Sequence, residues 1–123
     1  MPTTPPTLNG QLIGRTHQAT RAVFDRILAA TGTTFAQWIA LNHTVPGSPV
    51  PPATIAELLD LGLVCIADEH VARTAAGEAR VAAIRAAIAA SGERLYAGLT
   101  PDDLATTGRV LSLIATRAEA ELG

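Results

Sequence analysis

Side chains with binding chemistry stand at helical spacing in the first third of the chain. His17, Arg21 and Phe24 are related as i, i+4 and i+7, so a helix would place all three on one face. Trp38 and Asn42 are also four residues apart. An arginine or histidine can pair with a carboxylate, and a tryptophan can stack on an aromatic ring. The alternative is that Trp38 is a core residue and Arg21 a solvated or interface side chain.

The histidines and the single cysteine are the other candidates for chemistry. His17, His43 and His70 lack the i, i+3 or i, i+4 spacing of helical metal ligands, so we expect no metal and no cofactor. A histidine titrates near neutral pH, so His17 or His43 would be the acid or base of an enzyme. Cys65 stands in an apolar run and is predicted to be a buried small hydrophobic residue.

Other catalytic signatures are missing from the sequence. It contains no glycine-rich phosphate loop, no nucleophile elbow and no paired-carboxylate motif. The sequence therefore favours a role other than catalysis but leaves an enzyme open.

Helical periodicity and capping residues predict the elements that position these side chains. Apolar residues recur at intervals of three and four over 8–30, which predicts a long amphipathic helix ended by Gly32. A second helix is predicted over 35–43, with Thr33 or Thr34 as its N-cap. Residues before the first helix are rich in proline and threonine, so we expect a flexible tail there.

The middle of the chain predicts a short helix followed by a small hairpin. Pro52 can open a helix because its missing N–H costs nothing in a first turn, and Gly62 is a natural stop. Residues 63–66 are predicted to form a strand, 67–70 a tight connection and 71–73 a returning strand.

Two further helices are predicted after the hairpin. Thr74 would cap a helix over 75–97. Thr100 as N-cap, Pro101 in the first turn and the acids that follow predict the start of the last helix. The apolar stripes of the first and last helices are extensive for a chain of 123 residues, which favours an interface between two subunits.

The amino-acid composition limits which cellular compartment and which class of binding partner we expect. The formal net charge is −2, which is the wrong sign for a protein that depends on bulk attraction to nucleic acid. One cysteine excludes an intrachain disulfide and agrees with a reducing compartment. No signal peptide and no membrane-spanning apolar run is visible, so we expect a cytoplasmic protein without a membrane partner.

Four stretches in chain order resemble parts of one known family. They are Thr33–Leu41, Leu58–Val64, Val71–Glu78 and Leu99–Leu104. They resemble the second helix, the end of the recognition helix running into the wing, the return strand into the fifth helix, and the start of the last helix of the MarR family of bacterial transcription regulators. The resemblance covers about residues 8–122.

The resemblance implies an all-α fold with a small two-stranded β-wing and an obligate homodimer. Residues 1–7 would be the flexible tail and 8–123 a single domain. Within it, 8–31 and 99–123 would be dimerisation helices from both chain ends, and 34–98 the winged-helix lobe with its connecting helix. The expected dimer interface contains Leu8, Leu12, Leu104, Leu111, Ile114 and Leu122.

The family often holds a small molecule between its dimer helices and its DNA-binding lobe. The resemblance therefore implies a pocket for a small anionic or aromatic ligand. Its expected residues are His17, Arg21, Phe24, Trp38 and Asn42.

The sequence departs from the family where DNA would be read. A helix-turn-helix needs two helices joined by a short turn, but residues 44–61 have room for only one short helix. Roughly one helix, on the order of a dozen residues, is missing, and the wing is short. No lysine or arginine occurs between Arg26 and Arg73, whereas four acidic residues do, and these acids would repel phosphates.

These departures lead to three hypotheses for function. The first is a dimeric regulatory protein that acts through a small-molecule or protein partner rather than through direct DNA binding. The alternative is an ordinary DNA-binding repressor, in which Thr54, Arg73 and Arg80 would contact DNA. The second alternative is a cofactor-free enzyme built in the cleft, with His17 or His43 as acid or base.

Overall fold

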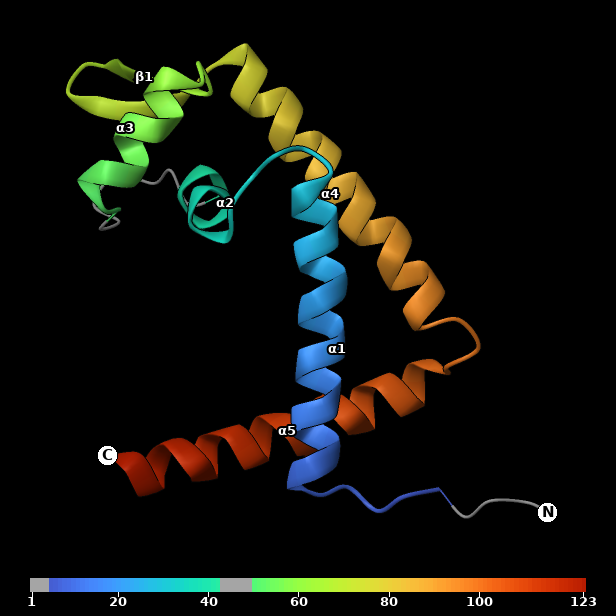
Figure 1. Ribbon diagram of the computed structural model, residues 1–123. Coiled ribbons are helices and arrows are strands. Elements are labelled where there is room, and N and C mark those ends of the chain that lie inside the picture. The colour runs from blue at the N-terminus through green and yellow to red at the C-terminus, as the bar shows by residue number, and fades with distance from the viewer. Residues whose placement is uncertain (1–4, 43–49) are drawn as a thin grey trace. The chain divides into compact units, whose positions relative to one another are not determined.

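The computed structural model describes residues 5–42 and 50–123. Within these ranges the chain forms five helices and two strands (Figure 1). The predicted class, all-α with a two-stranded β-wing, is confirmed. Residues 1–4 of the predicted tail and His43 lie outside the described residues. The elements are α1 (Gly10–Ala29), α2 (Phe35–Asn42), α3 (Pro52–Asp60), β1 (Val64–Ala67), β2 (His70–Arg73), α4 (Ala75–Leu95) and α5 (Pro101–Leu122).

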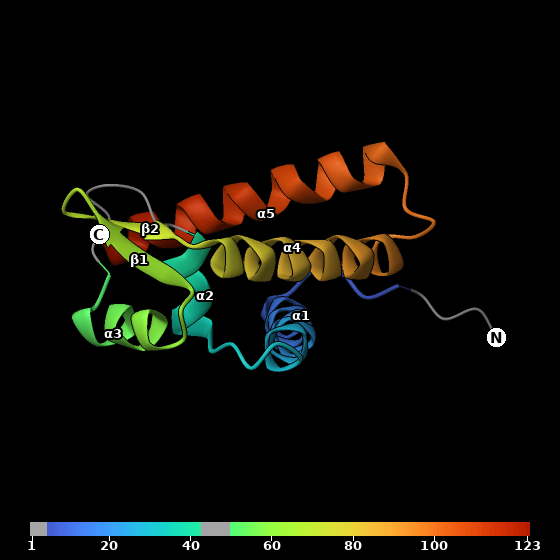
Figure 2. The same cartoon turned by 90° about the horizontal axis from the view of Figure 1, so that it is seen from above.

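The chain divides into two compact units. The first unit is Met1–Ala89 and the second is Ala90–Gly123, so the boundary falls within α4. In the first unit α2 lies between α1 and α3, as Figure 1 and Figure 2 both show. The second unit consists of the end of α4, a short connection and α5.

Capping side chains fix the start of the first two helices. The Asn9 side chain accepts a hydrogen bond from the Leu12 amide at 2.8 Å, so α1 begins after Asn9 rather than at Leu8. At α2 the Gln37 amide donates to Thr34 Oγ1, and the Thr34 amide donates to Gln37 Oε1, both at 3.1 Å. This reciprocal pair is a capping box, and it identifies Thr34 as the N-cap.

A Schellman arrangement joins α3 to the hairpin. Gly62 has φ of +72°, and the Leu63 amide donates to the Leu58 carbonyl at 3.0 Å. Because this bond holds Leu63 back on the helix end, β1 begins at Val64, one residue later than predicted. At the other end Ala67 pairs with His70 and belongs to the strand, so the connection is shorter than predicted.

The hairpin loop therefore contains only Asp68 and Glu69. Both residues have positive φ, 51° and 65°, as a two-residue type I′ turn requires. Strand β1 pairs with β2 in antiparallel register from Val64 with Arg73 to Ala67 with His70. Antiparallel pairing through so short a loop makes a compact wing.

Two threonines start the remaining helices as predicted. Thr74 Oγ1 accepts a hydrogen bond from the Gly77 amide at 3.1 Å. Thr100 forms a capping box with Asp103, with bonds of 3.0 and 3.2 Å, and Pro101 opens α5. Helix α4 ends at Leu95, two residues earlier than predicted.

One hydrophobic core lies in the first unit and joins its helices to the hairpin. Side chains from five elements and the turn after α3 meet there, which explains why a short wing is held in place. The buried apolar residues are Leu28, Trp38, Ala40, Leu41, Leu58, Leu63, Val64, Val81 and Ile84.

Candidate functional site

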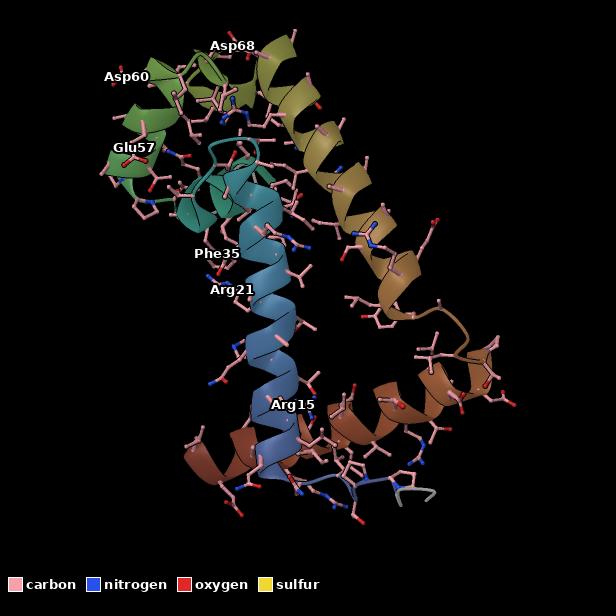
Figure 3. All side chains as sticks on the ribbon, turned by 45° about the vertical axis from the view of Figure 1, so that its right-hand side comes forward. Arg15, Arg21, Phe35, Glu57, Asp60 and Asp68 are labelled. Atoms are coloured by element: carbon pink, nitrogen blue, oxygen red, sulfur yellow. The ribbon has the colours of Figure 1, made fainter. Side chains whose placement is uncertain are left out.

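An arginine and three aromatic rings meet where α1 packs against α2. The Phe24 ring lies edge-on to Phe35 and Trp38, with centroids 6.0 and 6.3 Å apart. The Arg21 guanidinium carbon lies 3.9 Å from the Phe35 ring centroid (Figure 3). Arg21 also donates from Nε to Asp25 at 3.0 Å. The structure thus brings together the predicted residues Arg21, Phe24 and Trp38, together with Phe35, which the sequence reasoning did not select.

The exposed part of this cluster differs from the predicted pocket lining. Trp38 is 6% exposed and belongs to the core, as the alternative reading proposed. Phe35 is 41% exposed and is the aromatic ring that a ligand could reach. Phe35 stands at the start of α2, four residues before Ile39, so a helix places both side chains on one face. This spacing is the signal in the sequence that could have identified Phe35.

The other two predicted pocket residues lie elsewhere in the first unit. His17 is an exposed residue of α1, one turn before Arg21. Asn42 lies at the end of α2, where its Oδ1 accepts a hydrogen bond from Arg85 Nη2 at 2.6 Å. This bond ties the end of α2 to α4, so Asn42 has a structural partner.

Helix α3 lies between α2 and β1, where the resemblance places the DNA-reading helices. Of the described residues between α2 and β1, only Pro52–Asp60 form a helix. The Gln37 side chain on α2 donates to Glu57 Oε2 on α3 at 3.0 Å. Thr54 is 7% exposed, so its side chain faces the interior and offers little surface to DNA.

Arg73, the first arginine after the acidic stretch, is half-buried and bonds to two neighbouring helices. Its Nε donates to Glu78 Oε1 at 3.0 Å, and its Nη1 donates to the Leu41 carbonyl at 3.1 Å. The side chain is 21% exposed. Arg73 therefore caps the end of α2 with its charge. Arg80 lies on α4 and is also half-buried.

The outer surface of α3 and the hairpin is acidic. Asp60, Asp68 and Glu69 are exposed, and Figure 3 shows Glu57 and Asp60 on α3 and Asp68 at the hairpin. Since the chain has no lysine or arginine from residue 27 to 72, no cation of this stretch offsets them. This surface carries the same sign of charge as the phosphates of DNA.

The prediction that Cys65 is buried is wrong, because its thiol is exposed. Successive side chains of a strand point to opposite faces, and Val64 takes the face that packs on the core. The sheet has only two strands, so nothing in the described fold covers its other face. We therefore expect Cys65 to react with a thiol reagent in the folded protein about as fast as in urea, which absorbance of the released chromophore would measure. Protection that is lost only on unfolding would contradict this exposure.

The predicted interface residues are largely exposed within the single chain. Leu8, Leu104, Leu111, Ile114 and Leu122 are exposed, and Leu12 is half-buried. Helix α5 lies wholly in the described range, and none of its residues is buried. Its apolar stripe is thus available to another surface.

The part of the chain that the structure describes holds neither a cluster of metal-ligand side chains nor a membrane-spanning helix. In 5–42 and 50–123, no three metal-ligating side chains of the His, Cys, Asp or Glu type come together. In the same ranges, no helix is long and apolar enough to cross a membrane.

Solved structures, rather than sequences, relate the chain to known proteins. No protein-family profile and no curated protein matches the sequence. The transcriptional regulator PA3341 matches with 28% identity, a TM-score of 0.67 and coverage of 90% of this chain and 98% of that chain. The MarR family protein Rv2887 of Mycobacterium tuberculosis in complex with DNA matches with 21% identity, a TM-score of 0.67 and coverage of 89% and 98%.

The same mycobacterial protein also matches as its complex with salicylic acid. That match has 21% identity, a TM-score of 0.63 and coverage of 89% of this chain and 97% of that chain. The order of the helices and the two-stranded wing of this chain agree with these structural matches. The chain has the winged-helix fold of the MarR family of transcriptional regulators.

Proposed function

We propose that the protein is a homodimeric regulator of the MarR fold that acts through a small-molecule or protein partner rather than by reading DNA directly. One observation carries this proposal: the surface of α3 and the hairpin presents acids, and the arginine that ends this stretch is half-buried and bonded within the fold. Asp60, Asp68 and Glu69 are exposed, whereas Arg73 bonds to Leu41 and Glu78.

Electrostatics argue against direct reading through this surface. Non-specific affinity for DNA comes mostly from lysine and arginine side chains that neutralise phosphates and release counterions. Those same contacts fix the register in which base edges are read. Without a lysine or arginine side chain that can reach phosphates, α3 and the hairpin would lose both the non-specific affinity and the fixed register.

Dimerisation is supported by the apolar stripe of α5. Leu111 and Ile114 are exposed together with Leu104 on one face of a helix that buries no residue. An exposed stripe of this kind on a soluble helix usually marks an interface. A second copy would cover it symmetrically.

A small anionic ligand is supported at the α1–α2 contact. Arg21 is stacked on exposed Phe35, and the arginine can pair with a carboxylate while the ring packs against an aromatic ligand. Asp25 already bonds to Arg21, so a ligand carboxylate would have to displace Asp25. The mycobacterial neighbour solved with salicylic acid makes a carboxylate-bearing aromatic the first ligand to test.

Fluorescence anisotropy with a duplex from upstream of its own gene tests the proposal. We expect no sequence-selective, salt-sensitive binding by the wild-type protein. A double substitution, Asp60→Arg with Asp68→Arg, should create salt-sensitive non-specific binding, because each new cation can neutralise a phosphate. Glu119→Arg with Glu121→Arg changes the net charge equally on α5 and serves as the matched control. Selective, salt-sensitive retention of the duplex by the wild-type protein would refute the proposal.

A DNA-binding repressor is the second candidate, and the neighbour solved in complex with DNA favours it. In that case Arg80 is the better contact to test, because Arg73 also holds the fold together. Arg80→Ala should then abolish DNA retention, whereas Arg109→Ala on α5 should preserve it.

A further inference from the structure

Two apolar side chains that stand beside the acids of α3 and the hairpin in the sequence are also exposed. Leu61, directly after α3, is 51% exposed, and Ile66 on β1 is 62% exposed. Ile66 points to the same face of the strand as buried Val64, but it lies beyond the edge of the core. We call Asp60, Leu61, Ile66, Asp68 and Glu69 the wing surface.

The hairpin loop places a charged residue, Glu69, at a strained backbone position. Glu69 has φ of +65°, a conformation that glycine adopts freely and glutamate does not. The second position of a type I′ turn strongly prefers glycine. A side chain held at such a position costs conformational energy, which is a reason to look for a role of its carboxylate.

We propose that the wing surface docks a protein segment that carries lysine or arginine side chains around an apolar ridge. This inference rests on the proposed function and names its partner. Apolar side chains would pack on Leu61 and Ile66, while the cations would pair with Asp60, Asp68 and Glu69. Complementary charge would mainly raise the rate and the specificity of association.

Charge complementarity selects this occupant over the others. DNA and anionic lipid carry the same sign as the wing surface and are repelled by it. A second wing surface from another copy of the chain would meet like charge with like charge. A cationic protein segment removes both the exposed apolar area and the uncompensated negative charge.

A labelled synthetic peptide tests docking on the full-length protein. The probe is a leucine–lysine helix of about 14 residues with leucines on one face, compared with a scrambled peptide of identical composition. We expect the wild-type protein to bind the amphipathic peptide more tightly than the scrambled one, and less tightly as salt is raised.

Three double variants separate the contribution of the charges from that of the apolar side chains to peptide binding. Asp60→Asn with Glu69→Gly removes two charges and relieves the strained turn, so the fold is retained while peptide binding should weaken about tenfold. Leu61→Ser with Ile66→Thr should weaken it about as much. Glu119→Gln with Glu121→Gln removes two charges from α5 and should leave binding unchanged.

The outcomes separate this inference from the proposed function. Absence of peptide binding, equal binding of the scrambled peptide, or equal loss in the α5 control would overturn docking at the wing surface. The same anisotropy assay with duplex DNA reports on the proposed function alone. A protein that binds neither probe refutes the docking and leaves the proposed function standing, whereas selective DNA binding refutes the proposed function.

Discussion

Gly77→Ala is expected to lower the free energy of unfolding by about 2–3 kcal/mol. A Cβ atom at Gly77 would collide with the backbone carbonyl oxygen of Leu63. That carbonyl accepts a hydrogen bond from the Thr74 amide at 3.1 Å, while the Thr74 hydroxyl donates to the Gly62 carbonyl at 2.6 Å. Because these bonds tie the start of α4 to the end of α3, the backbone has little freedom to move away.

Urea denaturation monitored by circular dichroism measures this effect. Gly14→Ala is the matched control, because Gly14 lies within α1 and a Cβ there meets no atom within 4 Å. Alanine is the better helix former, so this control should raise stability by about 0.5–1 kcal/mol. An unchanged midpoint for Gly77→Ala would mean that α4 is not packed against Leu63 as described.

Leu111→Asp with Ile114→Asp is expected to convert a dimer into a monomer. Burying two carboxylates in an apolar interface costs several kcal/mol, so the dissociation constant should rise by more than about a hundredfold. Sedimentation velocity at several protein concentrations measures the change. Both side chains are exposed in the single chain, so the monomer should keep its helical content.

Arg109→Asp provides the control for the dimer. It changes the net charge by the same amount but lies two residues before Leu111, on the opposite side of the helix. We expect this variant to remain dimeric. A wild-type protein that sediments as a monomer, or a double variant that stays dimeric, would contradict an interface built on α5.

Local signals were sufficient to predict where most elements begin and end. Thr34, Pro52 and Thr100 start helices because their side chains or rings suit the first turn, and this information is local in the sequence. Gly62 ends α3 because it adopts positive φ. The one-residue error at β1 arose from the bond between Leu63 and Leu58, which belongs to the helix end rather than to the strand.

Local patterns in the sequence did not reveal the contacts between side chains of elements that are far apart in the chain. The exposure of Cys65 depends on which face of a two-stranded sheet meets the core, and the apolar run did not reveal that face. Only the DNA-binding alternative assigned Arg73 to DNA, and no local pattern indicated its bonds to Leu41 of α2 and Glu78 of α4. Phe35 became part of the site because it packs against Phe24 and Arg21 of another helix. The assignment of dimer helices, lobe and pocket residues stays a prediction.

The acidity of α3 and the hairpin, in contrast, is readable from the sequence alone. Glu57, Asp60, Asp68 and Glu69 stand in a stretch without cations, and the fold leaves three of them on its outer surface without a described partner. The structure adds that Glu57 bonds to Gln37 and so joins two helices. The local charge is thus partly structural and partly available for recognition.

The bonds of Arg73 couple its charge to the stability of the lobe. A substitution that turned its guanidinium outward would break the bonds to the Leu41 carbonyl and to Glu78, and a hydrogen bond to a charged group contributes about 1.5–3 kcal/mol. A phosphate contact on the surface of α3 and the hairpin would therefore require new basic residues at other positions.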